Sequence, residues 1–208
     1  MNDPQGGVPP VDWEERYRTG QTPWDTGRPS SELQRVLKEY QIGPCRTLEL
    51  GCGTGTNAVF LAERGFEVTA CDVSEQAISL ARQRADRANV AVQFLTCDLL
   101  ELTDLGEPFP FVFDRGVYHA VRRENLAGML AVLQRVTVPG SLWLTLAGNA
   151  NDPEPREGGP PQVRAEEICR ELEPLFAIVQ LREFRFDAAC IDGQESRPLG
   201  WSVLARRR

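Results

Sequence analysis

The chain has 208 residues, of which 41% are hydrophobic and 25% are charged, proportions that fit a globular protein and exclude a disordered or fibrous one. Thirty acidic against 23 basic side chains leave a net charge of −7, which argues against electrostatic binding to nucleic acid or to an anionic membrane. No apolar run approaches the roughly 20 residues of a membrane helix, and no signal peptide is visible. We therefore expect a cytoplasmic monomer or homodimer with no nucleic-acid or membrane partner.

The first 44 residues differ from the rest of the chain. Residues 1–10 are rich in proline and glycine and are predicted to be disordered. Two short helices are predicted over residues 11–17 and 31–37, and the glycine and proline content of residues 20–29 predicts a loop between them. Two of the four tryptophans, Trp13 and Trp24, lie in this segment, ahead of the main domain.

Strand and helix signals alternate from residue 45 to the end of the chain, with no linker that would divide a domain. Strands are predicted over residues 46–50, 66–71, 90–96, 109–114, 141–147, 176–186 and 199–205. Helices are predicted over 56–64, 74–85, 126–133 and 164–175, and a polar loop over 148–161. This alternation predicts an α/β fold with a doubly wound, mostly parallel sheet of seven strands. The last strand follows its neighbour without a helix between them, so it is predicted to be antiparallel.

The cysteines do not suggest a metal site. None of the six stands in a CxxC pair, and His119 is the only histidine, so a zinc site is not expected. Several of them lie in apolar, strand-like runs, where a reduced and buried thiol is expected. The six are Cys45, Cys52, Cys71, Cys97, Cys169 and Cys190.

A glycine-rich loop joins the first predicted strand to the first helix of the main domain, with the sequence ELGCGTG over residues 49–55. Its glycines allow a tight turn and a close approach of ligand to backbone at a helix N-terminus. Asp72 ends the second strand, where a carboxylate can accept hydrogen bonds from both ribose hydroxyls. Together they predict a nucleoside cofactor. A dinucleotide fingerprint needs a third glycine where Thr56 stands, which disfavours an NAD-dependent dehydrogenase.

The loop resembles motif I of the class I S-adenosylmethionine (SAM)-dependent methyltransferases. Residues 71–74, 96–99, 111–115 and 138–140 resemble four further motifs of that family, in the same order. The resemblance implies a Rossmann-like fold with SAM as cofactor, Asp72 on the ribose, Asp98 on the adenine amine and Asp114 beside the methionine part. The residues it places at the cofactor are Trp24, Glu49, Gly51, Cys52, Gly53, Thr54, Gly55, Asp72, Val73, Asp98, Leu99, Asp114 and Arg115.

Residues 13–29, WEERYRTGQTPWDTGRP, resemble the opening of the thiopurine, tellurite-resistance and methyl halide/thiol groups of small-molecule methyltransferases. The resemblance implies one domain over residues 11–208, with an N-terminal helical lid at 11–44 on a core at 45–208. It also places Trp24 near the methionine end, where an aromatic face attracts a sulfonium. Trp24 as a simple anchor for the N-terminal arm is the alternative. We expect methyl transfer to a small-molecule acceptor, a soft nucleophile such as a thiol.

The acceptor side is less defined by the sequence. A thiolate, selenide or halide needs no strong protein base, whereas a phenol or hydroquinone would benefit from one. His119 is the candidate base, in the predicted loop after the fourth strand, and a structural role is its alternative. The residues expected to contact the acceptor are Tyr17, Trp24, Tyr118 and His119, and those that could bind an anionic acceptor are Arg28, Arg115 and Arg185.

O-methylation, SAM binding without catalysis and arsenite methylation are three other functions that the sequence leaves open. Residues 114–117, DRGV, lack the signature of enzymes that methylate amino groups of DNA bases or glutamine, which disfavours a macromolecular acceptor. O-methylation of a phenol or quinol in secondary metabolism is the first alternative, and a SAM-binding protein without catalysis is the second. Arsenite methylation would need a cysteine trio, such as Cys45, Cys71 and Cys190, that nothing in the sequence requires.

Overall fold

The computed structural model describes residues 11–103, 105–153, 161–187, 189–191 and 194–208, with only the backbone of 189–191 and 194–196. The predicted disordered stretch 1–10 and part of the predicted loop 148–161 lie outside these residues. The helices are α1 (Trp13–Thr19), α2 (Ser31–Glu39), α3 (Thr56–Ala62), α4 (Glu75–Ala88), α5 (Val117–Val136) and α6 (Ala165–Leu172), with a 3-10 turn, η1 (Leu99–Glu101). The central strands are β1 (Arg46–Leu50), β2 (Glu67–Asp72), β3 (Gln93–Thr96), β4 (Phe111–Arg115), β5 (Leu142–Asn149), β7 (Phe176–Arg185) and β10 (Leu199–Arg207).

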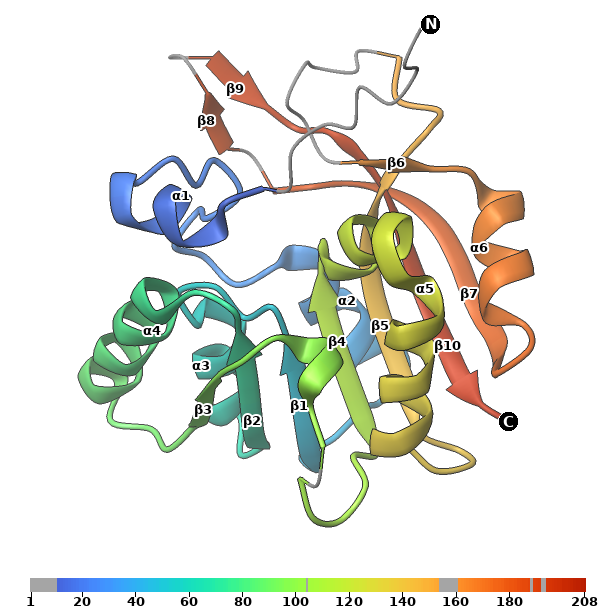
Figure 1. Cartoon of the computed structure of the whole chain (residues 1–208), viewed down its shortest axis with the longest axis horizontal. Helices are drawn as coiled ribbons and strands as arrows, with labels where there is room; N and C mark the ends of the chain where they lie inside the picture. Colours follow the sequence, from blue (N-terminus) through green and yellow to red (C-terminus); the bar gives the residue numbers. More distant parts are fainter. Residues whose placement is uncertain (1–10, 104, 154–160, 188, 192–193) are drawn as a thin grey trace, which may run out of the picture.

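These strands form one sheet in the order β3-β2-β1-β4-β5-β10-β7 (Figure 1). Neighbours from β3 to β5 pair in parallel, and β10 runs antiparallel to both β5 and β7. The predicted α/β sheet with an antiparallel last strand is therefore confirmed. Parallel strands joined through helices bring their carboxyl ends to one edge of the sheet, which is where ligands bind in open α/β folds.

Two additions lie outside the predicted strands. A short strand, β6 (Gln162–Val163), pairs with the end of β5. The connection predicted as a polar turn carries a hairpin of β8 (Ala189–Ile191) and β9 (Gln194–Ser196). Segments of two or three residues are too short for an alternating pattern to reveal.

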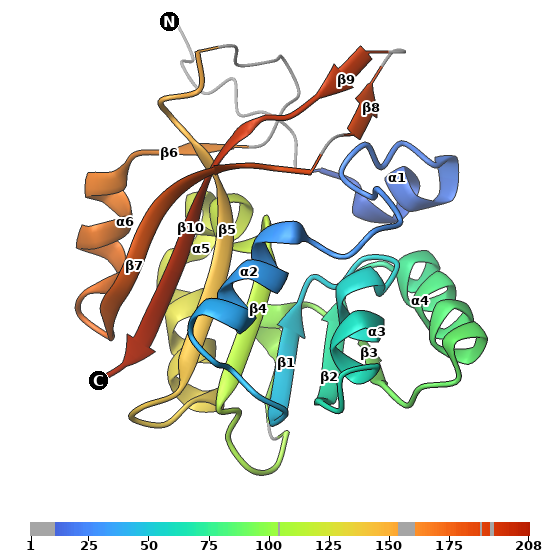
Figure 2. The ribbon, with the colours of Figure 1, turned by 180° about the vertical axis from the view of Figure 1, so that it is seen from behind.

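Each face of the sheet has its own hydrophobic core. Leu33 of α2, Phe60 of α3 and Ile78 of α4 belong to the core on one face, the side seen in Figure 2. Met129 of α5 and Ile168 of α6 belong to the core on the other face, the side seen in Figure 1. No helix in the described part of the chain is long and apolar enough to cross a membrane.

Helix α5 begins earlier than predicted and carries His119 in its first turn. The expectation of a loop at this position was wrong. Asp114 supplies the reason, because its Oδ1 accepts hydrogen bonds from the backbone N–H groups of Val117 (3.0 Å) and Tyr118 (3.1 Å) and so satisfies the helix start. A kink at Asn125, with φ −151° and ψ 68°, separates this first part from the predicted amphipathic part.

Candidate functional site

The glycine loop lies between β1 and α3, at the carboxyl edge of the sheet. Gly51 and Gly53 have φ values of 60° and 54°, a region that favours glycine. A Cβ on Gly51 would lie 2.3 Å from Cγ2 of Val117, and one on Gly53 would lie 2.6 Å from the Tyr17 hydroxyl oxygen. The loop therefore passes directly under α5 and α1, where only backbone fits.

Asp72 ties this loop to the next one. Its Oδ2 accepts a hydrogen bond from the Gly53 N–H (2.8 Å), and its Oδ1 accepts one from the Ser74 N–H (3.0 Å). Burial raises the pKa of this carboxyl group. Each oxygen keeps a lone pair for a ligand, since a carboxylate has about four acceptor positions. Val73 beside it is 52% exposed and offers an apolar surface at the same edge.

Asp98 reaches the same edge from β3. The Cys97 N–H donates to the Asp72 carbonyl oxygen (3.0 Å), so the two acidic turns are neighbours. Asp98 itself is exposed, and its Oδ1 caps η1 by accepting from the Leu100 N–H (2.8 Å). Leu99 is half-buried against the core of α5.

Glu49 stands at the entry of the loop with only 2% of its surface exposed. Its Oε1 accepts a long hydrogen bond from Asn57 Nδ2 (3.4 Å), and its Oε2 has no partner among the described residues. Burial raises the pKa of the carboxyl group to about 8. A buried carboxyl in this state is expected to hold a proton or to meet a cation.

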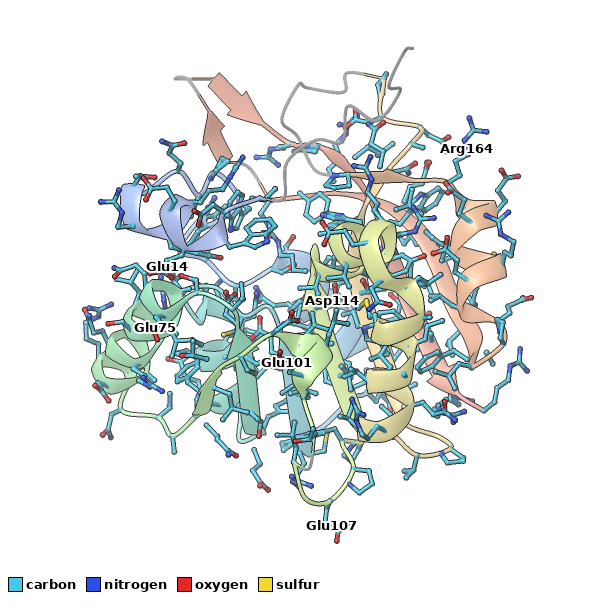
Figure 3. The ribbon with its side chains drawn as sticks, in the orientation of Figure 1. Glu14, Glu75, Glu101, Glu107, Asp114 and Arg164 are labelled. Atoms are coloured by element: carbon cyan, nitrogen blue, oxygen red, sulfur yellow. The ribbon has the colours of Figure 1, made fainter. Side chains whose placement is uncertain are left out.

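Glu14 and Asp25 attach the N-terminal segment to this edge. Oε2 of Glu14, on α1, accepts hydrogen bonds from the Ser74 hydroxyl (2.6 Å) and the Gln76 N–H (3.2 Å) at the start of α4 (Figure 3). The Thr54 hydroxyl of the glycine loop donates to Oδ2 of Asp25 (2.6 Å). These contacts hold residues 12–25 over the loop.

Two aromatic side chains fill the space beneath that segment. The Trp24 indole N–H donates to the Tyr17 hydroxyl (3.2 Å), and their ring centroids are 6.1 Å apart. Tyr17 is buried, and burial raises its pKa well above the usual range. Cys52 is also buried and belongs to the core of α3 and α4.

Asp114 lies in β4, one residue before the end of the strand (Figure 3), and has no exposed surface. In addition to the two α5 amides, its Oδ1 accepts from the Thr145 hydroxyl (3.0 Å) and its Oδ2 from the Trp143 indole N–H (2.9 Å). Burial raises the pKa of this carboxyl to about 6. Four donors from α5 and β5 hold the group, so it fixes the turn that carries the next two residues.

Arg115 extends from that turn to the N-terminal segment. Its Nη1 donates to the Trp24 carbonyl oxygen (2.9 Å), and its guanidinium lies 5.1 Å from the ring centroid of Phe186. Within the described residues, its other N–H groups make no hydrogen bond. Burial lowers its pKa, but a guanidinium stays charged in proteins. The sheet edge therefore carries a partly buried cation.

A pair of aromatic rings lies next to the Arg115 guanidinium. Phe184 and Phe186 lie with ring centroids 4.7 Å apart at the end of β7. A Cβ on Gly200, in the neighbouring strand β10, would lie 2.6 Å from the Phe184 ring and 2.7 Å from the Phe186 ring. The absence of a side chain at Gly200 therefore leaves room for both rings.

His119 lies four residues after Arg115, in the first turn of α5, and is 6% exposed. Its Nδ1 accepts a hydrogen bond from the Gly148 N–H at the end of β5 (2.8 Å). Burial, and to a smaller degree the Arg115 charge, lower its pKa to about 3, so the ring is neutral at physiological pH.

Residues 47–140 match the model of a methyltransferase domain family. The chain is 27% identical to a 2-heptyl-1-hydroxyquinolin-4(1H)-one methyltransferase of Mycobacteroides abscessus, over 80% of this chain and 73% of that protein. It is also 27% identical to a probable thiol methyltransferase of Arabidopsis thaliana, over 78% of this chain and 72% of that one. A solved structure, from work on the conversion of a disulfide bond into a thioacetal group during echinomycin biosynthesis, matches with a TM-score of 0.79 and 26% identity over 93% and 89% of the chains.

These matches support a class I SAM-dependent methyltransferase. They support an enzyme that acts on small molecules, with SAM as its cofactor. The site of the methyltransferase fits such a cofactor. The oxygens of Asp72 keep acceptor positions for a ligand, and the unpartnered oxygen of Glu49 fits a ligand that carries positive charge.

Most residues expected at the site of the methyltransferase do meet at this edge, and Tyr118 does not. The Tyr118 side chain has no exposed surface, its ring packs 5.8 Å from that of Trp143, and its hydroxyl donates to Glu171 of α6 (2.7 Å). It joins α5 to α6 on the far side of the helix start.

The sequence did not predict four residues of the methyltransferase site. Glu14 and Asp25 lie inside the segment that carried the family resemblance, so a signal for them existed. Phe186 follows the end of β7, and Gly200 lies at the start of β10. The hydrophobic pattern of these segments predicts only that they are buried. The contact of Phe186 with Arg115 joins positions 71 residues apart, and no local signal predicts it.

Proposed function

We propose that this methyltransferase transfers the methyl group of SAM to a small soft nucleophile, with a thiol as the leading acceptor. The observation that carries the proposal is the partly buried Arg115 cation at a sheet edge whose one histidine is neutral and hydrogen-bonded. Such a site stabilises an acceptor that ionises by itself. The similarity to a probable thiol methyltransferase supports the same acceptor class.

The cofactor would be held by the loops that follow β1, β2 and β3. Asp72 is placed to accept hydrogen bonds from ribose hydroxyls, Val73 to pack against adenine, and Asp98 to accept from the adenine amine. The open oxygen of Glu49 would face the positive charge of the cofactor. When bound, SAM supplies a methyl group that is activated by a sulfonium.

The acceptor would bind between Arg115, Trp24 and Phe186. A guanidinium beside an acidic thiol favours its thiolate, since an opposite charge stabilises the ionised form. A free thiol has a pKa near 8.5, so a modest shift is enough at neutral pH. Closure by the N-terminal segment would exclude water while the thiolate sulfur bonds to the methyl carbon and the sulfonium–methyl bond breaks, its electron pair staying on the cofactor sulfur.

A phenol fits the site less well. Its pKa near 10 calls for a base. The pKa of His119 is lowered to about 3, its Nδ1 already accepts from Gly148, and the pKa of Tyr17 is raised. An acidic hydroxyl on a heteroaromatic ring would need no base either. The similarity to a hydroxyquinolinone methyltransferase makes that class the second candidate.

We also propose that residues 11–44 act as a lid on the core of residues 45–208. The bonds from Glu14 to the start of α4 and from Asp25 to the glycine loop support this division. The net charge of −7 supports a small acceptor over a nucleic acid.

The test is the formation of S-adenosylhomocysteine (SAH) from SAM across one panel of acceptors. The panel holds aromatic thiols, thiopurines, halides, tellurite, phenols, hydroquinones and an N-hydroxyquinolinone. Turnover is expected with the thiols first and the N-hydroxyquinolinone second. Turnover confined to simple phenols would contradict the proposal, and SAH binding without any turnover would favour a protein that only binds the cofactor.

A further inference from the structure

His119 has one ring nitrogen committed and one open. Its Nδ1 accepts the Gly148 N–H at 2.8 Å, and a neutral imidazole that accepts at Nδ1 carries its proton on Nε2. Within the described part of the chain, Nε2 makes no hydrogen bond, although the side chain is 6% exposed. Nε2 is not among the fully buried unpartnered atoms of the described residues, so a largely buried ring presents one accessible donor.

Gly116 keeps that donor uncovered. A Cβ on Gly116 would stand 3.3 Å from Nε2 and 3.5 Å from Cε1 of His119. The same residue has a φ of 95°, which follows from the sharp turn between β4 and α5. Glycine here serves both the turn and access to Nε2, next to the guanidinium of Arg115.

We infer that His119 is a fixed hydrogen-bond donor to the methyl acceptor, paired with Arg115, and does not act as its base. The inference rests on the proposed function and adds a residue role to it. Two N–H donors, from His119 and Arg115, would select acceptors that present a lone pair. A thiolate, or the oxygen or nitrogen of a ring, is such an acceptor.

Three surroundings keep the ring in this neutral form. Burial and the Arg115 charge lower the pKa of His119. Strand β5 faces it with the Gly148 N–H, a donor that the protonated ring could not accept. Its place in the first turn of α5 adds the positive end of the helix dipole. Each of the three disfavours a proton on Nδ1.

The single histidine of the chain makes a direct measurement possible. The untagged protein, labelled with ¹⁵N-histidine, gives one pair of ring nitrogen signals, whose shifts report the tautomer. We expect the Nε2–H tautomer with no titration between pH 5 and 9. A proton on Nδ1, or a titration between pH 5.5 and 8, would overturn the inference. This readout needs no acceptor, so it is independent of whether the proposed substrate class is right.

Two variants separate the nitrogens. His119→Gln keeps a donor near Nε2, and His119→Asn keeps an acceptor for Gly148 but lacks the outer donor. We expect His119→Asn to lower kcat/KM by about 10-fold or more with SAH affinity unchanged, because a hydrogen bond to a charged group contributes more than one between neutral groups. His119→Gln should recover most of the loss. Equal rates in the wild type and both variants would also overturn the inference.

Discussion

The two halves of the sheet edge present opposite chemistry, buried carboxyl groups in one and nitrogen donors in the other. The ends of β1 and β2 present Glu49 and Asp72, whereas the end of β4 and the start of α5 present Arg115 and the neutral His119. Burial raises the pKa values of both carboxyl groups and lowers that of the histidine, so burial favours the neutral form of all three. This difference fits the proposed arrangement, with a positively charged cofactor on one side and an anionic acceptor on the other. Low local polarity strengthens both attractions.

Removing the Arg115 cation is expected to have the largest effect, and that effect should fall on turnover and not on cofactor binding. Arg115→Met is expected to lower kcat/KM with a thiol about 100-fold, because a buried charged contact contributes on the order of 3 kcal/mol. The SAH dissociation constant should change less than about threefold, which calorimetry would measure. Arg115→Lys keeps the charge without the planar fork and should fall between. Equal losses of SAH binding and turnover would place Arg115 on the cofactor side instead.

The acidic half can be tested by a matched pair of carboxylates. Asp72→Asn should raise the SAH dissociation constant about 30-fold, since it weakens both the ligand contact and the bonds to Gly53 and Ser74. Asp98→Asn should raise it less than about threefold, because Asp98 is exposed and its cap to Leu100 can persist. Isothermal titration calorimetry gives both values. A larger effect at Asp98 would reverse the assigned order.

The N-terminal segment contacts both halves, through Glu14 with the start of α4 and through Trp24 with Arg115. If it acts as the proposed lid, this attachment should govern release of the cofactor product. Glu14→Ala removes the bonds to Ser74 and Gln76 and is expected to speed SAH dissociation about 10-fold. Glu15→Ala is the control on the same helix, since Glu15 pairs with Arg18 on the exposed face. Stopped-flow release of SAH compares the two. Identical release rates would argue against a lid.

Glu49 predicts a proton linked to cofactor binding. Its folded pKa of about 8 lies above its usual 4.5, so the carboxyl is mostly protonated at pH 7. This group's contribution to the free energy of unfolding is complete below pH 4.5 and is lost as the pH rises through about 8. A cationic ligand favours the ionised form, so SAM binding at pH 7 should release up to about one proton.

Calorimetry in two buffers of different ionisation enthalpy would count that proton. Glu49→Gln should abolish the release and remove this fall in stability with rising pH. Proton release that persists in Glu49→Gln would assign it to another group.

The smallest effect on catalysis is expected at Tyr118, which lies outside both halves of the sheet edge. Tyr118→Phe removes the bond to Glu171 and should lower the free energy of unfolding by about 1 kcal/mol. It should leave kcat/KM unchanged, which chemical denaturation and steady-state rates would show together. A clear fall in kcat/KM would return Tyr118 to the acceptor site.

The cofactor half was largely predictable because its signals are local. The glycine loop and Asp72 lie about one βαβ unit apart, and the parallel pairing of β1 with β2 brings them together. The acceptor half depends on distant contacts, such as Arg115 with Phe186 and Phe186 with Gly200. The start of α5 was missed since the capping side chain, Asp114, precedes the helix from within a strand. Tyr118 and His119 are adjacent in sequence, yet the helix directs them to different partners.

The central claim is that the acceptor ionises by itself and is held by Arg115, without a protein base. The most direct test is the pH dependence of kcat/KM for two aromatic thiols of similar size whose own pKa values differ. The account predicts that the inflection of the profile moves with the pKa of the thiol. An inflection that stays at one pH for both thiols would show a titrating group of the protein and would contradict it.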